Sequence, residues 1–209
     1  MVEILVIPLA LVLGYLAGRY RSYRLQNQSE AAVSRTLAQA FAAPVYHLLN
    51  NLTIQTQDGT TQVDHVLVSR FGVFVIETKH YKGWIFGDSK SPNWTQVLFK
   101  QKFRFQNPLR QNYKHVKAVQ AILDFLPPGC VHSVVVFTGS AEFKTVRPEG
   151  VCRLQDLVPY LQSFAEEVMS ENRLQFCVGR MECMRLALTH QTDIQHREQL
   201  ARRFGNRTN

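Results

Sequence analysis

The chain has 209 residues, a net charge of +8, and 45% hydrophobic against 19% charged residues. This length and composition suit one domain with a buried core and short appendages, and the positive charge favours a polyanionic partner, either nucleic acid or an anionic membrane surface. The four cysteines form no Cys-x-x-Cys pair and have no histidine at zinc-finger spacing, which argues against a structural zinc site.

The amino-terminal segment 1–18 carries a single charge, Glu3. As a helix it would reach about 27 Å, close to the roughly 30 Å hydrocarbon core of a bilayer. Glu3 stands where a cleaved signal peptide normally carries positive charge, and three arginines follow the apolar run. We therefore expect a single-pass membrane protein with a transmembrane helix at 1–18, a basic juxtamembrane linker at 19–28 and a cytoplasmic domain. A buried core helix and an uncleaved export signal are the alternatives.

A first helix of the domain is expected from Ser29, which can cap it, to about Phe41. Val33 and Leu37 lie on its buried face because they repeat at four-residue spacing. Glu30 falls at the end of that face and would point inward. For an isolated acid in a first helical turn, interaction with the helix dipole is a sufficient explanation.

The stretch 64–79 reads as a β-hairpin of two strands, at 61–69 and 72–79, around a tight turn. If the turn is centred between Arg70 and Phe71, Asp64 lies across from Glu77, and Lys79 follows two residues later on the same face. Both faces of the hairpin are apolar, as in a central, covered pair of strands. The apolar residues are Val66, Val68, Val73 and Val75 on one face, and Leu67, Phe74 and Ile76 on the other.

Two carboxylates and an ammonium thus converge at the end of apolar strands. Such charges are costly when buried without partners, so they either neutralise one another or hold a cation. The Asp64 and Glu77 oxygens suit a hard divalent ion such as Mg²⁺, with Mn²⁺ as an alternative. On spacing alone, a salt bridge from Lys79 to either acid explains the pattern equally well. His65 alternates to the other side of the sheet, where we expect it to pack.

Residues 100–105 alternate between basic and aromatic side chains. In an extended chain Lys100, Lys102 and Arg104 form a basic edge, and the phenylalanines between them form an aromatic edge. This combination suits phosphate contact and base stacking. A strand with one solvated and one packed face gives the same pattern.

Asn107-Pro108 is a strong helix start, with Asn as the cap and Pro in the first position. Arg110, Lys114 and Lys117 form a basic stripe on this helix that could follow a phosphate backbone, although exposed lysines on a helix are commonly just solvated. A buried strand at 131–137 and a helix at 155–170 follow. This order of elements predicts an α/β sandwich around a small mixed sheet. Residues 171–209 are expected to be a partly helical extension with a polar, basic tail.

Several separated motifs, in this order, resemble the nuclease-related domain known as NERD, which is grouped with the PD-(D/E)XK nuclease superfamily. They are the run Val63-Asp64-His65-Val66-Leu67-Val68, the run Gly72-Val73-Phe74-Val75-Ile76-Glu77-Thr78-Lys79, Gly83, Trp94, and Asn107-Pro108-Leu109-Arg110-Gln111-Asn112. The resemblance covers roughly 29–126. It implies a restriction-endonuclease-like α/β sandwich at 29–170.

The resemblance also implies a function, which is Mg²⁺-dependent hydrolysis of phosphodiester bonds in nucleic acid, with DNA as the expected substrate. Asp64, Glu77 and the Thr78 carbonyl would hold the metal. Lys79 would orient or activate the attacking water and stabilise developing charge. Glu30 matches the first-helix glutamate that joins the site in such domains, and Gln111 matches a polar residue that helps to hold substrate or site water.

Two other classes of function fit part of the sequence. One is a membrane-anchored module that binds nucleic acid through the basic region 100–117 without cleaving it. The other is a structural protein whose basic surface contacts anionic lipid. The combination of Asp64, Glu77 and Lys79 argues against a pure binder, because acids weaken contact with phosphate.

Overall fold

A computed structural model of the chain describes residues 2–187 and 198, with side chains described from residue 12 onward. The elements, in chain order, are α1 (Val2–Ala40), β1 (Tyr46–Thr56), β2 (Gly59–Ser69), β3 (Gly72–His80), β4 (Gly83–Phe86), β5 (Asn93–Leu98), β6 (Gln101–Gln106), α2 (Pro108–Ile122), β7 (Val131–Thr138), β8 (Ala141–Phe143), β9 (Val151–Arg153), α3 (Leu154–Gln162) and α4 (Glu171–Met184).

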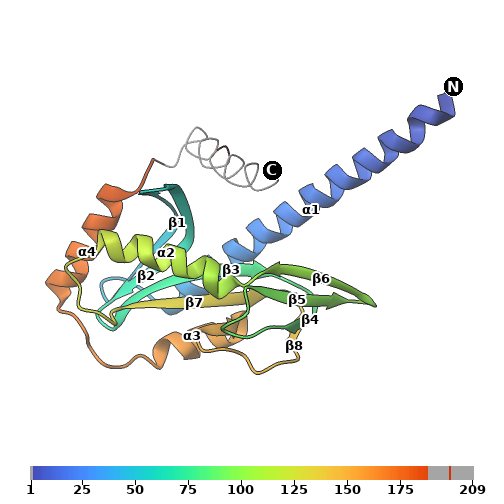
Figure 1. Ribbon diagram of the computed structural model, residues 1–209. Coiled ribbons are helices and arrows are strands. Elements are labelled where there is room, and N and C mark those ends of the chain that lie inside the picture. The colour runs from blue at the N-terminus through green and yellow to red at the C-terminus, as the bar shows by residue number, and fades with distance from the viewer. Residues whose placement is uncertain (1, 188–197, 199–209) are drawn as a thin grey trace.

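The main sheet has five strands in the order β1-β2-β3-β7-β9. The first three strands are antiparallel neighbours, whereas β7 and β9 run parallel to β3, so the sheet is mixed. The second half of α1 packs with α3 on one face, and α2 packs with α4 on the other (Figure 1). The predicted α/β sandwich around a mixed sheet is therefore confirmed.

The β2–β3 hairpin has the predicted register, with Ser69 paired to Gly72 and His65 paired to Ile76. Its valines at 66, 68, 73 and 75 pack in the core under α2 and α4. Leu67, Phe74 and Ile76 pack in the core under α1 and α3. Period-two alternation explains this division, because successive side chains of a strand point to opposite faces of the sheet.

A second, smaller sheet has the order β6-β5-β4-β8 and extends from the end of the main sheet (Figure 1). Its inner face is joined to the main sheet by aromatic packing. Trp94 stacks on Phe137 with ring centroids 6.0 Å apart, and Tyr81 stacks on Phe105 at 4.3 Å. Because these rings come from β5, β6, β7 and the segment after β3, they fix the small sheet against the end of β3.

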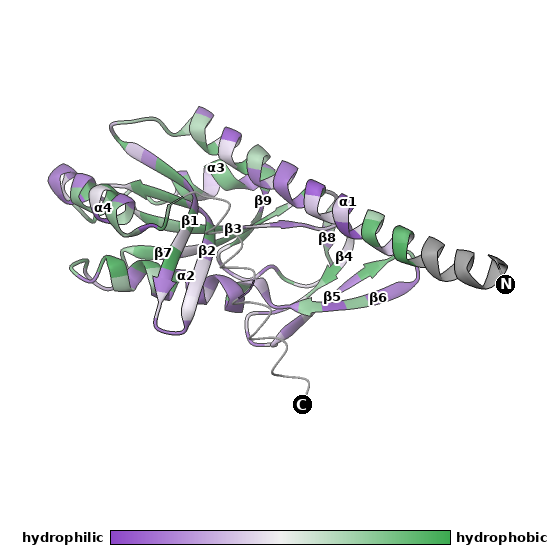
Figure 2. Cartoon of the chain, turned by 90° about the horizontal axis from the view of Figure 1, so that it is seen from above, coloured by the Kyte–Doolittle hydropathy of each residue, from purple (hydrophilic) through white to green (hydrophobic). Residues whose placement is uncertain are grey.

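The amino-terminal region differs from the sequence-based expectation. Residues 2–40 form one continuous helix, so the chain has no break at the predicted linker 19–28 (Figure 2). Within the described residues, no helix combines the length and apolarity that a bilayer crossing requires. The predicted transmembrane anchor at 1–18 is therefore unsupported; its first residue and the side chains of 2–11 lie outside the description. The cytoplasmic placement, which depended on that anchor, stays a prediction.

The carboxyl-terminal part also differs. The helix predicted at 155–170 ends at Gln162, and the chain then passes the hairpin turn, where the Val168 N–H donates to the Arg70 carbonyl at 2.8 Å. The helix cannot continue because this segment carries the chain from one face of the sheet to the other. α4 then joins the core through Leu174, Cys177 and Met181. Apart from residue 198, the predicted basic tail lies outside the described residues.

The packing of α4 predicts that the folded domain depends on residues beyond 170. Leu174→Ala removes a fully buried side chain and should lower the free energy of unfolding by about 2–5 kcal/mol, because it leaves a cavity. Arg180→Ala, on the exposed side of the same helix, is the control and should stay within about 0.5 kcal/mol of the parent. Urea denaturation measures both. Equal stability of the two variants would show that α4 does not belong to the core.

Candidate functional site

Asp64 lies where β2 and β3 separate. The strands pair as far as His65 and Ile76, and the next position in this register brings Asp64 beside Glu77. The Asp64 carboxylate accepts a hydrogen bond from the Thr78 N–H, with Oδ2 2.7 Å from the nitrogen. This bond holds the aspartate side chain across the end of β3.

Glu77 is the centre of the cluster and is only 3% exposed. Its Oε1 accepts hydrogen bonds from Lys79 Nζ at 2.6 Å and from Gln111 Nε2 at 2.7 Å. His115 Nε2 lies 3.2 Å from the other oxygen, Oε2. The sequence allowed a salt bridge from Lys79 to either Asp64 or Glu77, and in the structure Lys79 pairs with Glu77.

α2 supplies Gln111 and His115 from consecutive turns of one face. The helix begins at Asn107, whose side chain accepts from the Leu109 N–H at 2.9 Å, as the Asn-Pro start predicted. His115 is also held from β2, because its Nδ1 lies 2.7 Å from the Thr61 hydroxyl. Sequence reasoning missed His115; its place four residues after Gln111 was the available signal, since such residues share a helix face.

Glu30 approaches the cluster from α1 with a second residue that the sequence analysis missed, Gln26. The Gln26 side-chain amide donates to Glu30 Oε1 at 2.9 Å and to the Thr78 carbonyl at 2.8 Å. Gln26 Oε1 accepts a hydrogen bond from the His80 N–H at 3.3 Å. Gln26 therefore ties α1 to the end of β3, again through a pair four residues apart on one helix.

The two central acids have opposite electrostatic character. Burial raises the pKa of Asp64 well above its usual value, and the charges of Glu77 and Glu30 raise it further. Burial also opposes ionisation of Glu77, but Lys79 and His115 outweigh it and lower the Glu77 pKa. Burial and the Glu77 charge raise the pKa of Glu30. Lys79 thus lowers the Glu77 pKa but does not outweigh burial and the neighbouring acids at Asp64 and Glu30.

The fit of a metal ion rests on the two neighbouring carboxylates. In the part of the chain that is described, no group of three or more His, Cys, Asp and Glu side chains is arranged to hold a metal. Mg²⁺ does not need such a cage, because one or two carboxylates with water and substrate phosphate suffice. Burial and the nearby Glu77 and Glu30 charges raise the Asp64 pKa because they disfavour its ionised form, and a bound cation would offset both effects. The donor chemistry thus fits a hard divalent ion.

The predicted nucleic-acid-binding residues lie outside this cluster. Lys100 lies in the turn between β5 and β6, and Lys102 and Arg104 lie on β6. On α2, Arg110, Lys114 and Lys117 are exposed, whereas Gln111 and His115 face Glu77. The structure therefore brings together the predicted catalytic residues but leaves these six cations on surfaces around them.

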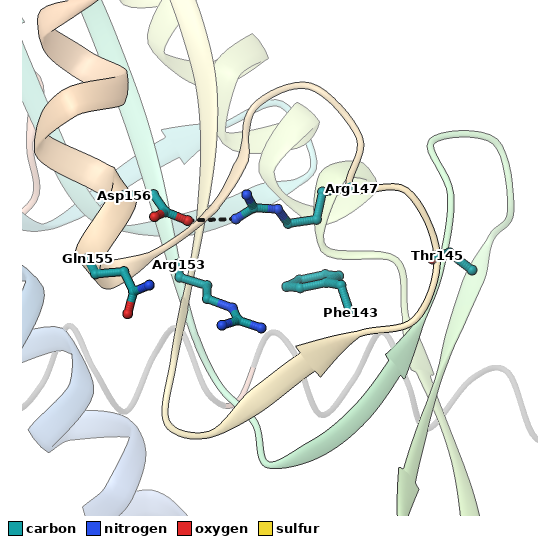
Figure 3. A pocket seen from close by; sticks show the side chains of 6 residues that line it. All are labelled: Phe143, Thr145, Arg147, Arg153, Gln155 and Asp156. Carbon is teal, nitrogen blue, oxygen red and sulfur yellow. Dashed lines mark hydrogen bonds and ion pairs between the residues drawn. The ribbon is translucent and has the colours of Figure 1, made fainter.

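A cavity of about 360 Å³ lies apart from this cluster, at the start of α3. Figure 3 shows its lining side chains, among them Arg147, whose guanidinium pairs with Asp156 at 2.7 Å. The lining contains none of the predicted catalytic or metal-binding residues. The cavity is therefore not part of the candidate site.

Comparison with known proteins gives a family and two individual similarities. The family model described as nuclease-related domain matches residues 25–138. An uncharacterized protein of Bacillus anthracis is 38% identical over 135 residues, which are 62% of this chain and 63% of that protein. The crystal structure of AF1548, a protein of unknown function, aligns with a TM-score of 0.35 and 11% identity over 76% of this chain and 96% of its own.

The opposite pKa directions predict opposite effects on stability in metal-free protein. The raised Asp64 pKa means that its ionised form destabilises the fold as pH rises above the unfolded pKa, so Asp64→Asn should be more stable than the parent at pH 8. The lowered Glu77 pKa means that its charge contributes stability that is lost as pH falls, so Glu77→Gln should be less stable. Thermal unfolding in EDTA measures both, and shifts of the same sign would refute this electrostatic description.

Proposed function

Because the chain belongs to the nuclease-related domain family, we propose that it is a metal-dependent nuclease that hydrolyses phosphodiester bonds of nucleic acid, with DNA as the first substrate to test. The observation that carries this proposal is the arrangement at the end of β3. Glu77 is buried and bonded to Lys79 at 2.6 Å, and Asp64 is held beside it by the Thr78 N–H. A module that only binds phosphate has no need of buried acids at its binding surface.

Asp64 and Glu77 would hold Mg²⁺ or Mn²⁺, with the Thr78 carbonyl as a further oxygen ligand. When bound, such an ion polarises the scissile phosphate and lowers the pKa of a bound water. The Thr78 carbonyl already accepts a hydrogen bond from Gln26, and its second lone pair is available to a ligand. Gln26 would therefore orient this carbonyl.

Lys79 acts as a cation in this scheme. Burial lowers its pKa, but the Glu77 charge outweighs burial and the net pKa lies above the usual value. The side chain therefore stays an ammonium at neutral pH. It would orient the attacking water and stabilise the negative charge that develops on the phosphate, and would not remove a proton itself.

Gln111 and Glu30 complete the proposed machinery from the two helices. Gln111 shares Glu77 Oε1 with Lys79, so it would keep that carboxylate oriented and contact water or substrate nearby. Glu30 has a raised pKa because of burial and the Glu77 charge. It would act on the water or on a second metal ion.

The substrate would be drawn in by charge. The chain carries +8 overall, and exposed cations lie on β6 and on α2, the helix that also supplies Gln111 to the acidic cluster. Such surfaces favour a polyanion through counterion release, which makes binding weaken as salt rises. The proposed phosphate contacts are Lys100, Lys102, Arg104, Arg110, Lys114 and Lys117.

A binding module without cleavage is the second candidate, and one observation favours it. Lys79, Gln111 and His115 already surround both oxygens of Glu77 without any metal. In the binding module, this cluster would stabilise the fold and would have no catalytic role. Activity measurements separate the two candidates, because the binder would retain salt-sensitive binding without hydrolysis.

We predict that Asp64→Ala and Lys79→Ala each reduce cleavage by about 100-fold or more, since each removes an electrostatic contribution to the reaction. Linear, circular and single-stranded DNA, and RNA, would be incubated with the purified chain in Mg²⁺, Mn²⁺ or EDTA. Asp124→Ala, an exposed acid near the end of α2, is the matched control and should retain parent activity. Parent activity in either site variant, in the presence of metal, would refute these roles.

A further inference from the structure

The outward face of the small sheet combines aromatic and basic side chains from neighbouring strands. In the strand register, Trp84 pairs with Val97, which pairs with Lys102. Phe86 pairs with Thr95, which pairs with Arg104. Paired residues point to the same face of a sheet, so the two aromatics and the two cations share one surface, which we call the outer face.

β6 has the alternation that the sequence predicts, in the form of a strand with one solvated and one packed face. Lys102 and Arg104 lie on the outer face, opposite Phe103 and Phe105. Phe105 stacks on Tyr81 and belongs to the packing against the main sheet. The aromatic rings that accompany the cations come from β4, a strand that pairing alone brings near β6.

Burial separates the two faces clearly. On the inner face, Ile85 is fully buried and Trp94 is 1% exposed. On the outer face, Trp84 is 48% exposed and Phe86 is 37% exposed. Trp84 and Phe86 lie at neighbouring positions of one face, and contiguous exposed apolar surface marks binding sites more often than single exposed rings do.

The charge of the outer face favours an anionic partner. Lys102 and Arg104 are exposed, and the Lys144 ammonium lies 4.8 Å from the centre of the Trp84 ring. Glu142, opposite Trp84 on β8, is the carboxylate of this face and bonds to Lys144. The outer face thus combines three cations and one acid with two partly exposed rings, and Lys144 lies over one of them.

We propose that the outer face binds single-stranded nucleic acid, with bases stacking on Trp84 and Phe86 and phosphates contacting Lys102, Arg104 and Lys144. Aromatic stacking favours a single strand because its bases are accessible, whereas duplex bases are already stacked on each other. Trp84 and Phe86 are two residues apart, about 6.5 Å along β4. The two rings can therefore take neighbouring bases of an extended strand.

This inference rests on the proposed nuclease function, because it gives the outer face a role in that site. Trp84 follows Lys79 by five residues, so their Cα atoms lie within about 18 Å of each other. A strand held on the outer face would reach the Asp64–Glu77 cluster within a few nucleotides. The outer face would thus select single strands, ends or gaps as substrates.

Binding of a fluorescein-labelled 15-nucleotide oligothymidylate to the full chain in EDTA tests the proposal. Trp84→Ala and Phe86→Ala should each weaken binding about 5- to 100-fold. Phe176→Ala removes an aromatic side chain of similar exposure on α4 and should bind like the parent. Thermal unfolding of each variant would verify that the fold is kept.

Intrinsic fluorescence gives a second readout, because the chain has only two tryptophans and Trp94 is buried. Oligothymidylate should quench the Trp84 emission, and Trp84→Phe should abolish the quenching while keeping affinity within about threefold of the parent, since it retains a ring. Matched duplex and anionic vesicles should compete weakly. Unchanged affinity in Trp84→Ala and Phe86→Ala, or preferential binding of vesicles, would overturn the proposal.

The two proposals can fail separately. If the parent chain cleaves nucleic acid with metal but the outer-face variants bind and cleave like the parent, the outer face has no such role and the nuclease assignment stands. If oligothymidylate binds and quenches in EDTA but no metal supports cleavage, the outer face stands and the nuclease assignment fails.

Discussion

The register of the β2–β3 hairpin is the constraint on which the candidate site depends. Because side chains alternate with period two, a slip of one residue between the strands would place Asp64 on the opposite face of the sheet from Glu77 and Lys79. The turn is fixed at Gly72, where φ is +145° and an added Cβ would come within 2.8 Å of His132. The Ser69 hydroxyl, which donates to the Gly72 carbonyl at 3.1 Å, closes the same turn. Packing of both apolar faces then holds the register.

The charged cluster at the open end of this hairpin is positioned by the helices on both sides of the sheet. α1 contributes Gln26 and Glu30, and α2 contributes Gln111 and His115, each pair four residues apart. Side chains from both helices therefore contact the end of β3, from opposite faces of the sheet. Gln111 and His115, together with Lys79 from β3, contact the two oxygens of Glu77, whose pKa is lowered, whereas burial and the Glu77 and Glu30 charges raise the pKa of Asp64. A bound metal ion would act on this difference, because its positive charge would stabilise the ionised form of Asp64, which the protein disfavours.

The parts of the fold that the sequence predicted correctly are governed by local rules. The hairpin, its two apolar faces and the helix start at Asn107 follow from turn chemistry, alternation and capping, all within a few residues. The parts that it missed depend on distant partners. His115 is held by Thr61, 54 residues away, and the rings of Trp84 and Phe86 share a face with Lys102 and Arg104 only because β4 pairs with β5 and β5 pairs with β6. The helix at 155 ends early because the chain must pass the hairpin turn, and the apolar run at the amino terminus continues into the helix that carries Glu30.

The central claim is that Asp64 and Glu77 share a divalent ion, and anomalous diffraction from crystals soaked in Mn²⁺ tests it most directly. The account predicts a strong anomalous peak about 2.1 Å from an oxygen of each carboxylate. A crystal with Mn²⁺ bound elsewhere, or with no peak beside Asp64 and with Glu77 still bonded to Lys79 and Gln111, would contradict it. In that case the cluster would be a structural ion pair.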